Sequence, residues 1–389
     1  MPQIDGLRFI AIIAVLAFHI RAITGWHLGV SGTSTYVNGP VNWMFDAGHN
    51  GVALFFAVSG FILALPFARM HLGLGEPVRL KAYYLRRLTR LEPPYVIHLL
   101  FLLVLTALVL RYQPTHTDVY QRPDWLRHTL QNLGVSLFYG THFVYTRHPL
   151  PNIVLWSLEV EVQFYLCAPF LACLFALRSA WTRRAIFAGL MLAPLIWLPL
   201  IPNGNWLVPT LLGQLQFFMA GFLVCDLFLT AGKDFSNRSW FWDLVFLAGI
   251  AGVVSGGHLA FVGTCLPGFV LLICLGAFRG RFASKVLSWP WITTVGGMCY
   301  TIYMYHWLMI SALIRFTAKA ATHVFWLDLL IQFALMTVII VAVCAVLFAL
   351  FERPFMKRDW PSDLRKWAVR RWCALKGNAM PISSESEKT

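Results

Sequence analysis

The feature that most limits what this chain can fold into is a series of apolar runs that recur from one end to the other. Each run is about 20 residues long, enough for a helix to cross the hydrocarbon core of a bilayer. A soluble domain would carry about twice the 12% of charged residues found here. We therefore expect an all-α fold, a polytopic membrane helix bundle.

The runs predict about ten transmembrane helices. With the N-terminus placed in the cytoplasm, most Lys and Arg fall in the inner segments between helices, as the positive-inside rule requires. This asymmetry explains most of the net charge of +14 without a nucleic-acid partner, and it places both termini in the cytoplasm. The predicted spans are 6–25, 50–68, 92–110, 153–177, 185–202, 211–230, 240–256, 260–278, 290–314 and 325–351.

Two regions are expected: a transmembrane domain over 1–353 and a cytoplasmic tail over 354–389. The tail begins with basic and aromatic residues in an amphipathic pattern, which suits a helix lying on an anionic inner leaflet. Its last residues, SSESEKT, are expected to be disordered. The eight cysteines form no C-x-x-C pair and no Cys/His cluster, so we expect neither a disulfide framework nor a metal site.

Arg8 and His19 are ionisable residues within the first predicted span. Their spacing puts them on the same face of a helix, about 16 Å apart along its axis. Ionisable groups within a membrane-spanning helix usually face the bundle interior or a wet cavity. The structural alternatives are that Arg8 snorkels to the inner headgroups and that His19 makes a hydrogen bond between helices.

A basic cluster precedes the third span, where Arg86, Arg87 and Arg90 share one helical surface. Guanidinium groups match phosphate oxygens in pairs, so the cluster suits a phosphate-bearing ligand. A plain positive-inside anchor is the alternative. The fourth span carries Glu159 and Glu161, which face different neighbours and each need a partner, such as an arginine or an exchangeable proton.

Other motifs are weaker when taken singly. Glycines in the second span permit close approach of helix backbones, and Ser59 beside them can bond a neighbouring carbonyl or a substrate. The motif FERPF suggests an ion pair between Glu352 and Arg353 at the inner surface. The glycines are Gly48, Gly51 and Gly60, and the ninth span adds a polar, aromatic lining with Tyr300, Tyr303, Tyr305 and His306.

As an ordered set, these motifs resemble those of the integral-membrane acyltransferase family 3, over residues 4–355. They are R-x10-H, G-x-x-G-V-x-L-F-F-x-x-S-G-F, R-R-x-x-R-x-x-P-x-Y, W-S-L-x-x-E-x-x-F-Y, Y-x-x-Y-x-x-H-W and F-E-R-P-F. The chain departs from the family at Ala53, where many relatives carry a polar or acidic residue. It departs again at His49 and Asn50, which replace positions that are more often apolar.

The resemblance implies an acyl-CoA-dependent O-acyltransferase (an acetyltransferase) without an extracellular hydrolase-like domain. Such proteins move an acyl group, commonly acetyl from acetyl-CoA, to a hydroxyl of a carbohydrate in a surface polysaccharide, lipid-linked glycan or glycoside. We expect a multi-pass protein of the bacterial cytoplasmic (inner) membrane. Its partners would be acyl-CoA, a carbohydrate or glycolipid acceptor and membrane lipids, with no bound cofactor and no nucleic acid. The oligomeric state stays open.

The resemblance also assigns roles. Arg8 and His19 match the paired family residues, Glu161 rather than Glu159 falls on the family's glutamate, and Arg87 and Arg90 match its basic motif. In the predicted mechanism His19 is a general base, Glu161 orients its imidazole, and Arg8 assists. Arg86, Arg87 and Arg90 would bind the CoA phosphates, and the substrate cavity would include Ser59, Trp156, Ser157, Tyr303 and His306.

Several alternatives remain open at this point. His19 can carry the acyl group itself instead of acting as a base. The acyl group can be succinyl or longer, and the acceptor can be a macrolide-type metabolite. From another class of protein, a transporter or flippase for a lipid-linked sugar or a small anion also fits ten spans with buried charges.

Overall fold

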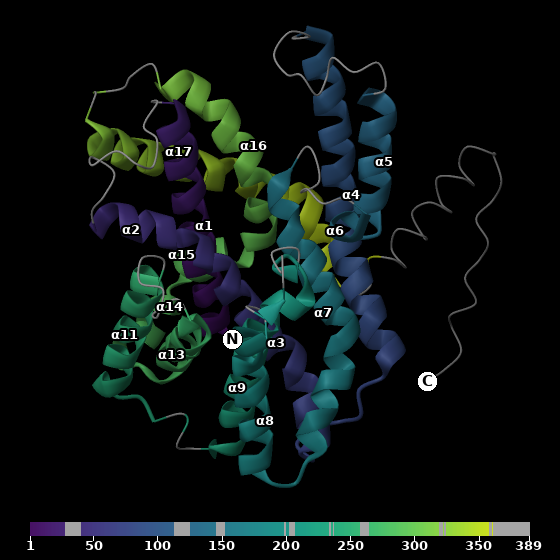
Figure 1. Cartoon of the computed structure of the whole chain (residues 1–389), viewed down its shortest axis with the longest axis vertical. Coiled ribbons are helices and arrows are strands. Elements are labelled where there is room, and N and C mark those ends of the chain that lie inside the picture. The colour runs from purple at the N-terminus through teal and green to yellow at the C-terminus, as the bar shows by residue number, and fades with distance from the viewer. Residues whose placement is uncertain are drawn as a thin grey trace, which may run out of the picture.

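The computed structural model describes residues 1–27, 40–112, 125–144, 152–197, 200–201, 207–232, 235, 237–256, 264–318, 322, 324–357 and 360. Over these residues the chain is a bundle of helices, and its β-structure is one isolated bridge between Ser239 and Gly280 (Figure 1). The all-α prediction is confirmed. The predicted tail, apart from its first residues, lies outside the described residues.

Six helical stretches among the described residues are long and apolar enough to cross a membrane, so the prediction of a polytopic membrane protein is confirmed. A helix also lies in each of the other four predicted spans. The six stretches contain α1 (Pro2–His27), α3 (Gly51–His71), α4 (Leu80–Tyr112), α7 (Trp156–Ala172), α9 (Leu211–Thr230) and α17 (Phe325–Leu347).

The ninth predicted span, 290–314, is two helices and not one, because the chain breaks at Met298 between α15 (Pro290–Gly297) and α16 (Cys299–Thr317). Short 3-10 and π turns join several longer helices. The remaining elements are α2 (Pro40–Asp46), η2 (Ala47–Asn50), α5 (Trp125–Leu137), α6 (Thr141–Val144), η3 (Ile153–Leu155), η4 (Cys173–Ala176), α8 (Ala180–Trp197), α11 (Trp240–Gly256), α13 (Leu266–Arg279), α14 (Arg281–Leu287), η8 (Phe348–Glu352) and η9 (Arg353–Met356).

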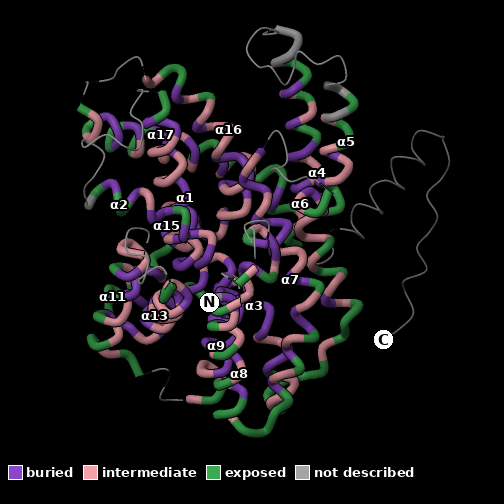
Figure 2. Tube along the Cα trace, viewed as in Figure 1, coloured by how far each residue is buried: buried purple, intermediate pink, exposed green. Residues whose placement is uncertain are grey.

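The core consists of two apolar clusters that meet along α1. Ile4, Leu7 and Ala11 join the first cluster, with residues of α3, α7, α9 and α13. Ile12 and Leu16 join the second, with residues of α4, α16 and α17. Buried positions therefore line the interior, while the exposed ones lie on outward faces such as those of α4, α5 and α8 (Figure 2). This places α1 at the centre of the bundle.

Glycine allows the turn η2 and the start of α3 to touch the α1 backbone. A Cβ atom on Gly48 would lie 2.1 Å from the carbonyl oxygen of Ala14, and one on Gly51 would lie 2.4 Å from that of Ala11. Both distances are impossible for real side chains, so only glycine permits this packing. The close contact brings the residues of η2 beside His19.

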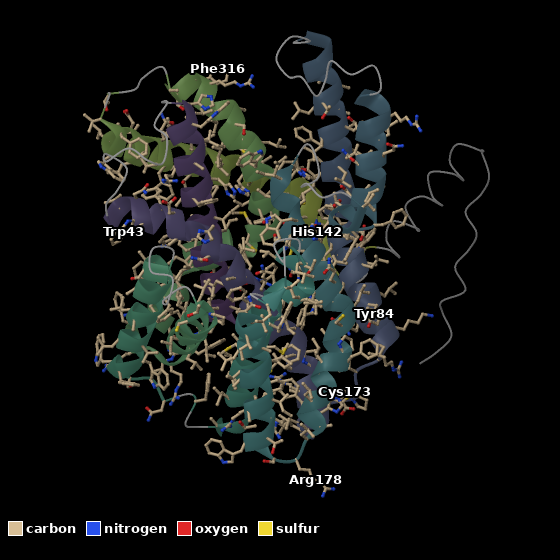
Figure 3. All side chains as sticks on the ribbon, in the orientation of Figure 1. Trp43, Tyr84, His142, Cys173, Arg178 and Phe316 are labelled. Carbon is tan, nitrogen blue, oxygen red and sulfur yellow. The ribbon has the colours of Figure 1, made fainter. Side chains whose placement is uncertain are left out.

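Ion pairs fix helices at two other places. Near the C-terminal end of α1, Arg21 bonds Asp46 of α2 at 2.6 Å, and Asn42 bonds both residues. Between α8 and α9, the buried Asp226 carboxylate accepts from Arg183 at 2.7 Å and from Arg184 at 2.9 Å. Figure 3 labels Arg178 and Phe316 at opposite ends of the molecule.

Candidate functional site

Three cavities follow one another through the bundle. The basic cavity is lined by Arg86, Arg87, Arg90 and Lys357, among others. The central cavity shares Arg87 and Arg90 with it and adds residues of α1, α3, α7 and α16. The outer cavity shares Val52 and Tyr303 with the central one and includes His19. Consecutive cavities therefore have walls in common, from the arginine cluster to the imidazole.

Four cations surround the basic cavity, which has a volume of about 360 Å³. Its arginines come from the first turns of α4, where their spacing keeps them on one surface. Arg87 is held between two aromatic rings, 5.9 Å from the centroid of Tyr83 and 5.7 Å from that of Tyr165. Such stacking restricts the guanidinium and leaves its donors for a ligand. The cavity is chemically suited to phosphate groups.

The central cavity is narrow, with a volume of about 110 Å³. Three guanidinium groups and two carboxylates line it among the described residues: Arg8, Arg87, Arg90, Glu161 and Glu352. Arg8 faces this cavity and pairs with Asp5 at 2.9 Å. Two interpretations of Arg8 were open, a residue that faces a cavity and one that snorkels to the lipid headgroups. Its place in the wall of the central cavity favours the first.

Glu161 accepts two hydrogen bonds within the central cavity, from Ser59 at 2.6 Å and from Tyr165 at 2.5 Å. Since Tyr165 also faces Arg87, the carboxylate is coupled to the arginine cluster through a phenol. Glu159 has a different task. It is buried and accepts from the backbone N–H groups of Thr141 and His142 at 3.2 Å, which anchors α6 to α7. The two glutamates face different neighbours, as predicted.

Glu352 was expected to pair with Arg353 at the inner surface, and this prediction is wrong. Glu352 is 3% exposed, lines the central cavity and accepts from the hydroxyl of Thr301 at 2.5 Å and from its N–H at 3.2 Å. Arg353 is exposed. The reason is the π turn η8, which rotates the end of α17 so that the carboxylate points into the bundle.

Tyr303 stands between the central and outer cavities and lines both. Its hydroxyl donates to the carbonyl oxygen of Val154 at 2.8 Å, and so it accepts from the hydroxyl of Ser157 at 2.6 Å. The two bonds tie α16 to η3 and α7 and hold the ring in place. Val52 of α3 and Tyr303 are the wall residues that the two cavities share, and we call this pair the neck.

The outer cavity has a volume of about 380 Å³ and combines aromatic rings with polar side chains. His19 shares it with Trp156, Gln214, His49 and Asn50. The Nδ1–H of His49 donates to the carbonyl oxygen of Asp46 at 2.6 Å, which leaves its Nε2 as an acceptor. Aromatic faces beside amide and imidazole groups suit a hydroxyl-rich ligand.

The hydrogen bonds of His19 fix which of its nitrogens is free. His306 is fully buried, and its Nδ1 lies 2.6 Å from the Tyr303 carbonyl oxygen, so that nitrogen carries a hydrogen. Neutral His306 then offers Nε2 as an acceptor, 3.2 Å from Nδ1 of His19. Nδ1 of His19 is also 3.0 Å from the Val15 carbonyl oxygen. Because both neighbours are acceptors, Nδ1 carries the hydrogen, and Nε2 of His19 keeps its lone pair.

The orienting partner of His19 is therefore His306 and not Glu161. Among the described residues, Glu161 bonds Ser59 and Tyr165 in the central cavity, while the imidazole bonds His306 and Val15. His306 was expected to line the substrate cavity, but it lies behind His19, outside the walls of the three cavities. The structure brings the other predicted site residues to the cavity walls.

Sequence reasoning missed several polar wall residues, among them Glu352 of the central cavity and His49 and Asn50 of the outer one. A signal existed for the last two, because they depart from the apolar pattern of the span that they precede. For Glu352 the motif F-E-R-P-F marked the residue but not its facing, since a π turn changes the facing of a residue without changing the apolar pattern around it.

Comparison with known proteins bears directly on this arrangement. The family model described as an acyltransferase domain, acyltransferase 3, matches residues 1–349. The peptidoglycan O-acetyltransferase OatA of Listeria monocytogenes is 26% identical over 216 residues, covering 52% of this chain and 29% of that protein. A protein of Staphylococcus aureus strain MSSA476 named as an O-acetyltransferase is 22% identical over 357 residues, covering 80% and 51%.

Nodulation protein 10 of Rhizobium leguminosarum bv. viciae is 24% identical over 373 residues, which cover 91% of this chain and 92% of that protein. By contrast, the chain spans only about half or less of the first two relatives. No solved structure matches the chain. Since the family model covers most of the sequence, this multi-pass membrane protein belongs to the acyltransferase 3 family.

Proposed function

We propose that the protein is a membrane O-acyltransferase of the bacterial cytoplasmic (inner) membrane. It takes an acyl group, above all acetyl, from acyl-CoA and transfers it to a hydroxyl of a carbohydrate acceptor. The family and the names of the relatives support the reaction class. The donor and the acceptor are our inference from the cavities, and the membrane is what membership of the family implies.

The observation that carries the proposal is the series of cavities with shared walls. The phosphates of CoA lie against Arg86, Arg87 and Arg90 in the basic cavity. The central cavity of about 110 Å³ is too small for a nucleotide but suits the thin pantetheine arm, which passes Arg8 and Glu161. The thioester then reaches the neck at Tyr303, next to the cavity that contains His19.

The chemistry at the neck is one acyl transfer. Nε2 of His19 accepts the proton of the acceptor hydroxyl, whose oxygen attacks the thioester carbonyl. The new C–O bond forms as the C–S bond breaks, and the imidazolium returns its proton to the departing thiolate. His306 holds His19 in the tautomer that this step needs. The products are an ester and free CoA, so atoms and charge balance.

The test uses the purified full chain in lipid nanodiscs, supplied with acetyl-CoA and a methyl glucoside. Release of free CoA is measured with a thiol reagent, and the acetyl ester is measured by mass spectrometry. Replacing His19 by Ala should lower transfer by about 10²- to 10⁴-fold, the usual contribution of a general base. The matched control is His27→Ala, since His27 lies on the same helix and makes the same type of bond to a backbone carbonyl.

Near-normal transfer by His19→Ala would overturn the role of the imidazole. If the wild-type protein released no CoA but moved a lipid-linked sugar or an anion across the bilayer, the transporter alternative would hold. In cells, surface glycans with and without the gene should differ by the mass of an acetyl group, which would also identify the acceptor.

A further inference from the structure

A fourth cavity lies beside the outer one and is almost entirely apolar. It has a volume of about 380 Å³ and lies among α1, α2, η2, α3, α11 and α13, with one wall residue from α17. We call it the apolar chamber. Among the described residues that line it, Asn50 is the only one with a polar side chain. Helices α11 and α13 stand beside α1 and α2 at this place (Figure 1).

The chamber is partly open, and its apolar side chains gain dispersion contacts when an apolar group packs against them. Water does not fill a cavity that offers it one polar group, because a buried water needs two to four partners. The α1 residues Ile13, Ala14 and Ala17 are half-exposed along one stripe, although α1 is the central helix of the bundle. A hydrocarbon chain is the occupant that fits such walls in a membrane.

The position of the chamber indicates which molecule supplies this hydrocarbon chain. Asn50 lines both the apolar chamber and the outer cavity, so η2 is a shared wall of the two spaces. Within a single turn of α1, Ala17 faces the chamber while His19 faces the outer cavity. A molecule with its head at His19 and its chain in the chamber would span less than one helical turn between them.

Asn50 is suited to the junction between head and chain. The residue is 8% exposed and lines both spaces. Its amide can donate to and accept from the hydroxyl groups of a head group that enters the outer cavity. The apolar walls and the amide at their edge together suit one amphipathic ligand.

On this basis, and resting on the proposed function, we propose that the acceptor is an amphipathic hydroxyl compound. Its hydrocarbon chain lies in the apolar chamber among α1, α11 and α13, and its hydroxylated head passes Asn50 to reach His19. The chain binds and orients the acceptor but takes no part in bond making.

The first experiment measures CoA release with methyl, octyl and dodecyl glucoside below their micellar concentrations. The KM should fall by at least about a hundredfold from methyl to octyl glucoside, since each buried methylene favours binding about fourfold. Val253→Phe, which fills the chamber from α11, should reduce this gain to under tenfold.

The matched control is Ala251→Phe, because Ala251 lies on the same helix but is exposed and outside the chamber. Partition of long glucosides into the bilayer is the same for both variants, so their ratio isolates the chamber. Equal use of all chain lengths by the wild-type protein, or an equal effect of both substitutions, would overturn the proposal and leave the O-acyltransferase function standing.

The second experiment does not depend on turnover. A dodecyl glucoside with a diazirine at the chain end is photolysed with the full chain in nanodiscs, and the labelled peptides are identified. Labels on α1 and α11 that dodecyl glucoside displaces would support the proposal. Displacement by phospholipid alone would mean that the chamber holds bilayer lipid, and displacement by a long-chain acyl-CoA would mean that it holds the donor chain. Either of these results, or no label on either helix, would overturn it.

Discussion

Replacing His306 by Phe tests whether this buried ring acts through His19. Phe has a similar size and lacks the acceptor nitrogen. The Nδ1–H of His19 would keep its bond to the Val15 carbonyl oxygen at 3.0 Å and lose the one to His306 at 3.2 Å. A neutral hydrogen bond contributes about 0.5–1.5 kcal/mol. If this whole free energy stabilises the reactive tautomer of His19, losing the bond should lower kcat by about 2- to 12-fold.

The assay is CoA release from acetyl-CoA by the purified variants. His306→Phe should lower kcat without changing the KM for acetyl-CoA, because the donor site lies beyond the neck. His306→Gln supplies a carbonyl acceptor and should recover most of the rate. Combining His306→Phe with His19→Ala should cost no more than His19→Ala alone, since His306 has no effect once its partner is gone.

Two results would refute this reasoning. A loss as large as that of His19→Ala, without recovery in His306→Gln, would mean that His306 itself transfers protons. An unchanged kcat would mean that Val15 alone fixes the tautomer. An equal drop in melting temperature in His306→Phe and His306→Gln would indicate that both substitutions loosen the packing. A difference between their kcat values would then still separate the lost hydrogen bond from this structural effect.

Three further predictions concern the donor, the fold and the helix contact. Arg87→Ala should raise the KM for acetyl-CoA about tenfold but leave the KM for acetyl-pantetheine unchanged, because acetyl-pantetheine has no nucleotide phosphates. The control Arg79→Ala, at an exposed position, should change neither KM. Equal effects of Arg87→Ala on both thioesters would rule out a phosphate site. Asp226→Ala should destabilise the protein by about 3–5 kcal/mol, because it leaves the Arg183 guanidinium, 3% exposed, without its carboxylate; a melting temperature equal to that of the wild type would contradict this. Gly51→Ala places a Cβ atom 2.4 Å from the Ala11 carbonyl oxygen and should cost about 1–3 kcal/mol and most of the transfer rate, whereas Gly134→Ala, with nothing within 4 Å, should be neutral in the same unfolding and activity assays.

The sequence predicted much of the fold because a membrane-spanning helix needs an apolar run of about 20 residues. Such runs can be recognised in a single sequence. The sequence also predicted that Arg8 and His19 face cavities in the bundle, since helical geometry relates residues within one helix. The break at Met298 was missed because both halves of the segment are apolar.

The partners of the site residues were harder to predict. Glu161 and His306 lie on different helices from His19, and which of them meets the imidazole depends on how α1, α7 and α16 pack. The facing of Glu352 depends on a π turn, which shifts the angular position of a side chain by local backbone geometry. Periodicity within one helix carries neither kind of information.

The continuity of α1 has a consequence for which thioesters the protein can use. Arg8 and His19 belong to one helix whose only proline is at its first residue, so no hinge can alter the interval between them. On the proposed function the donor's arm passes Arg8, so this helix fixes how far beyond Arg8 the thioester carbonyl must reach to meet the imidazole. An arm that is too short or too long would hold its carbonyl away from His19 even when its phosphates bind normally. Selection among thioesters would then depend on the length of the carrier as well as on the nature of the acyl group.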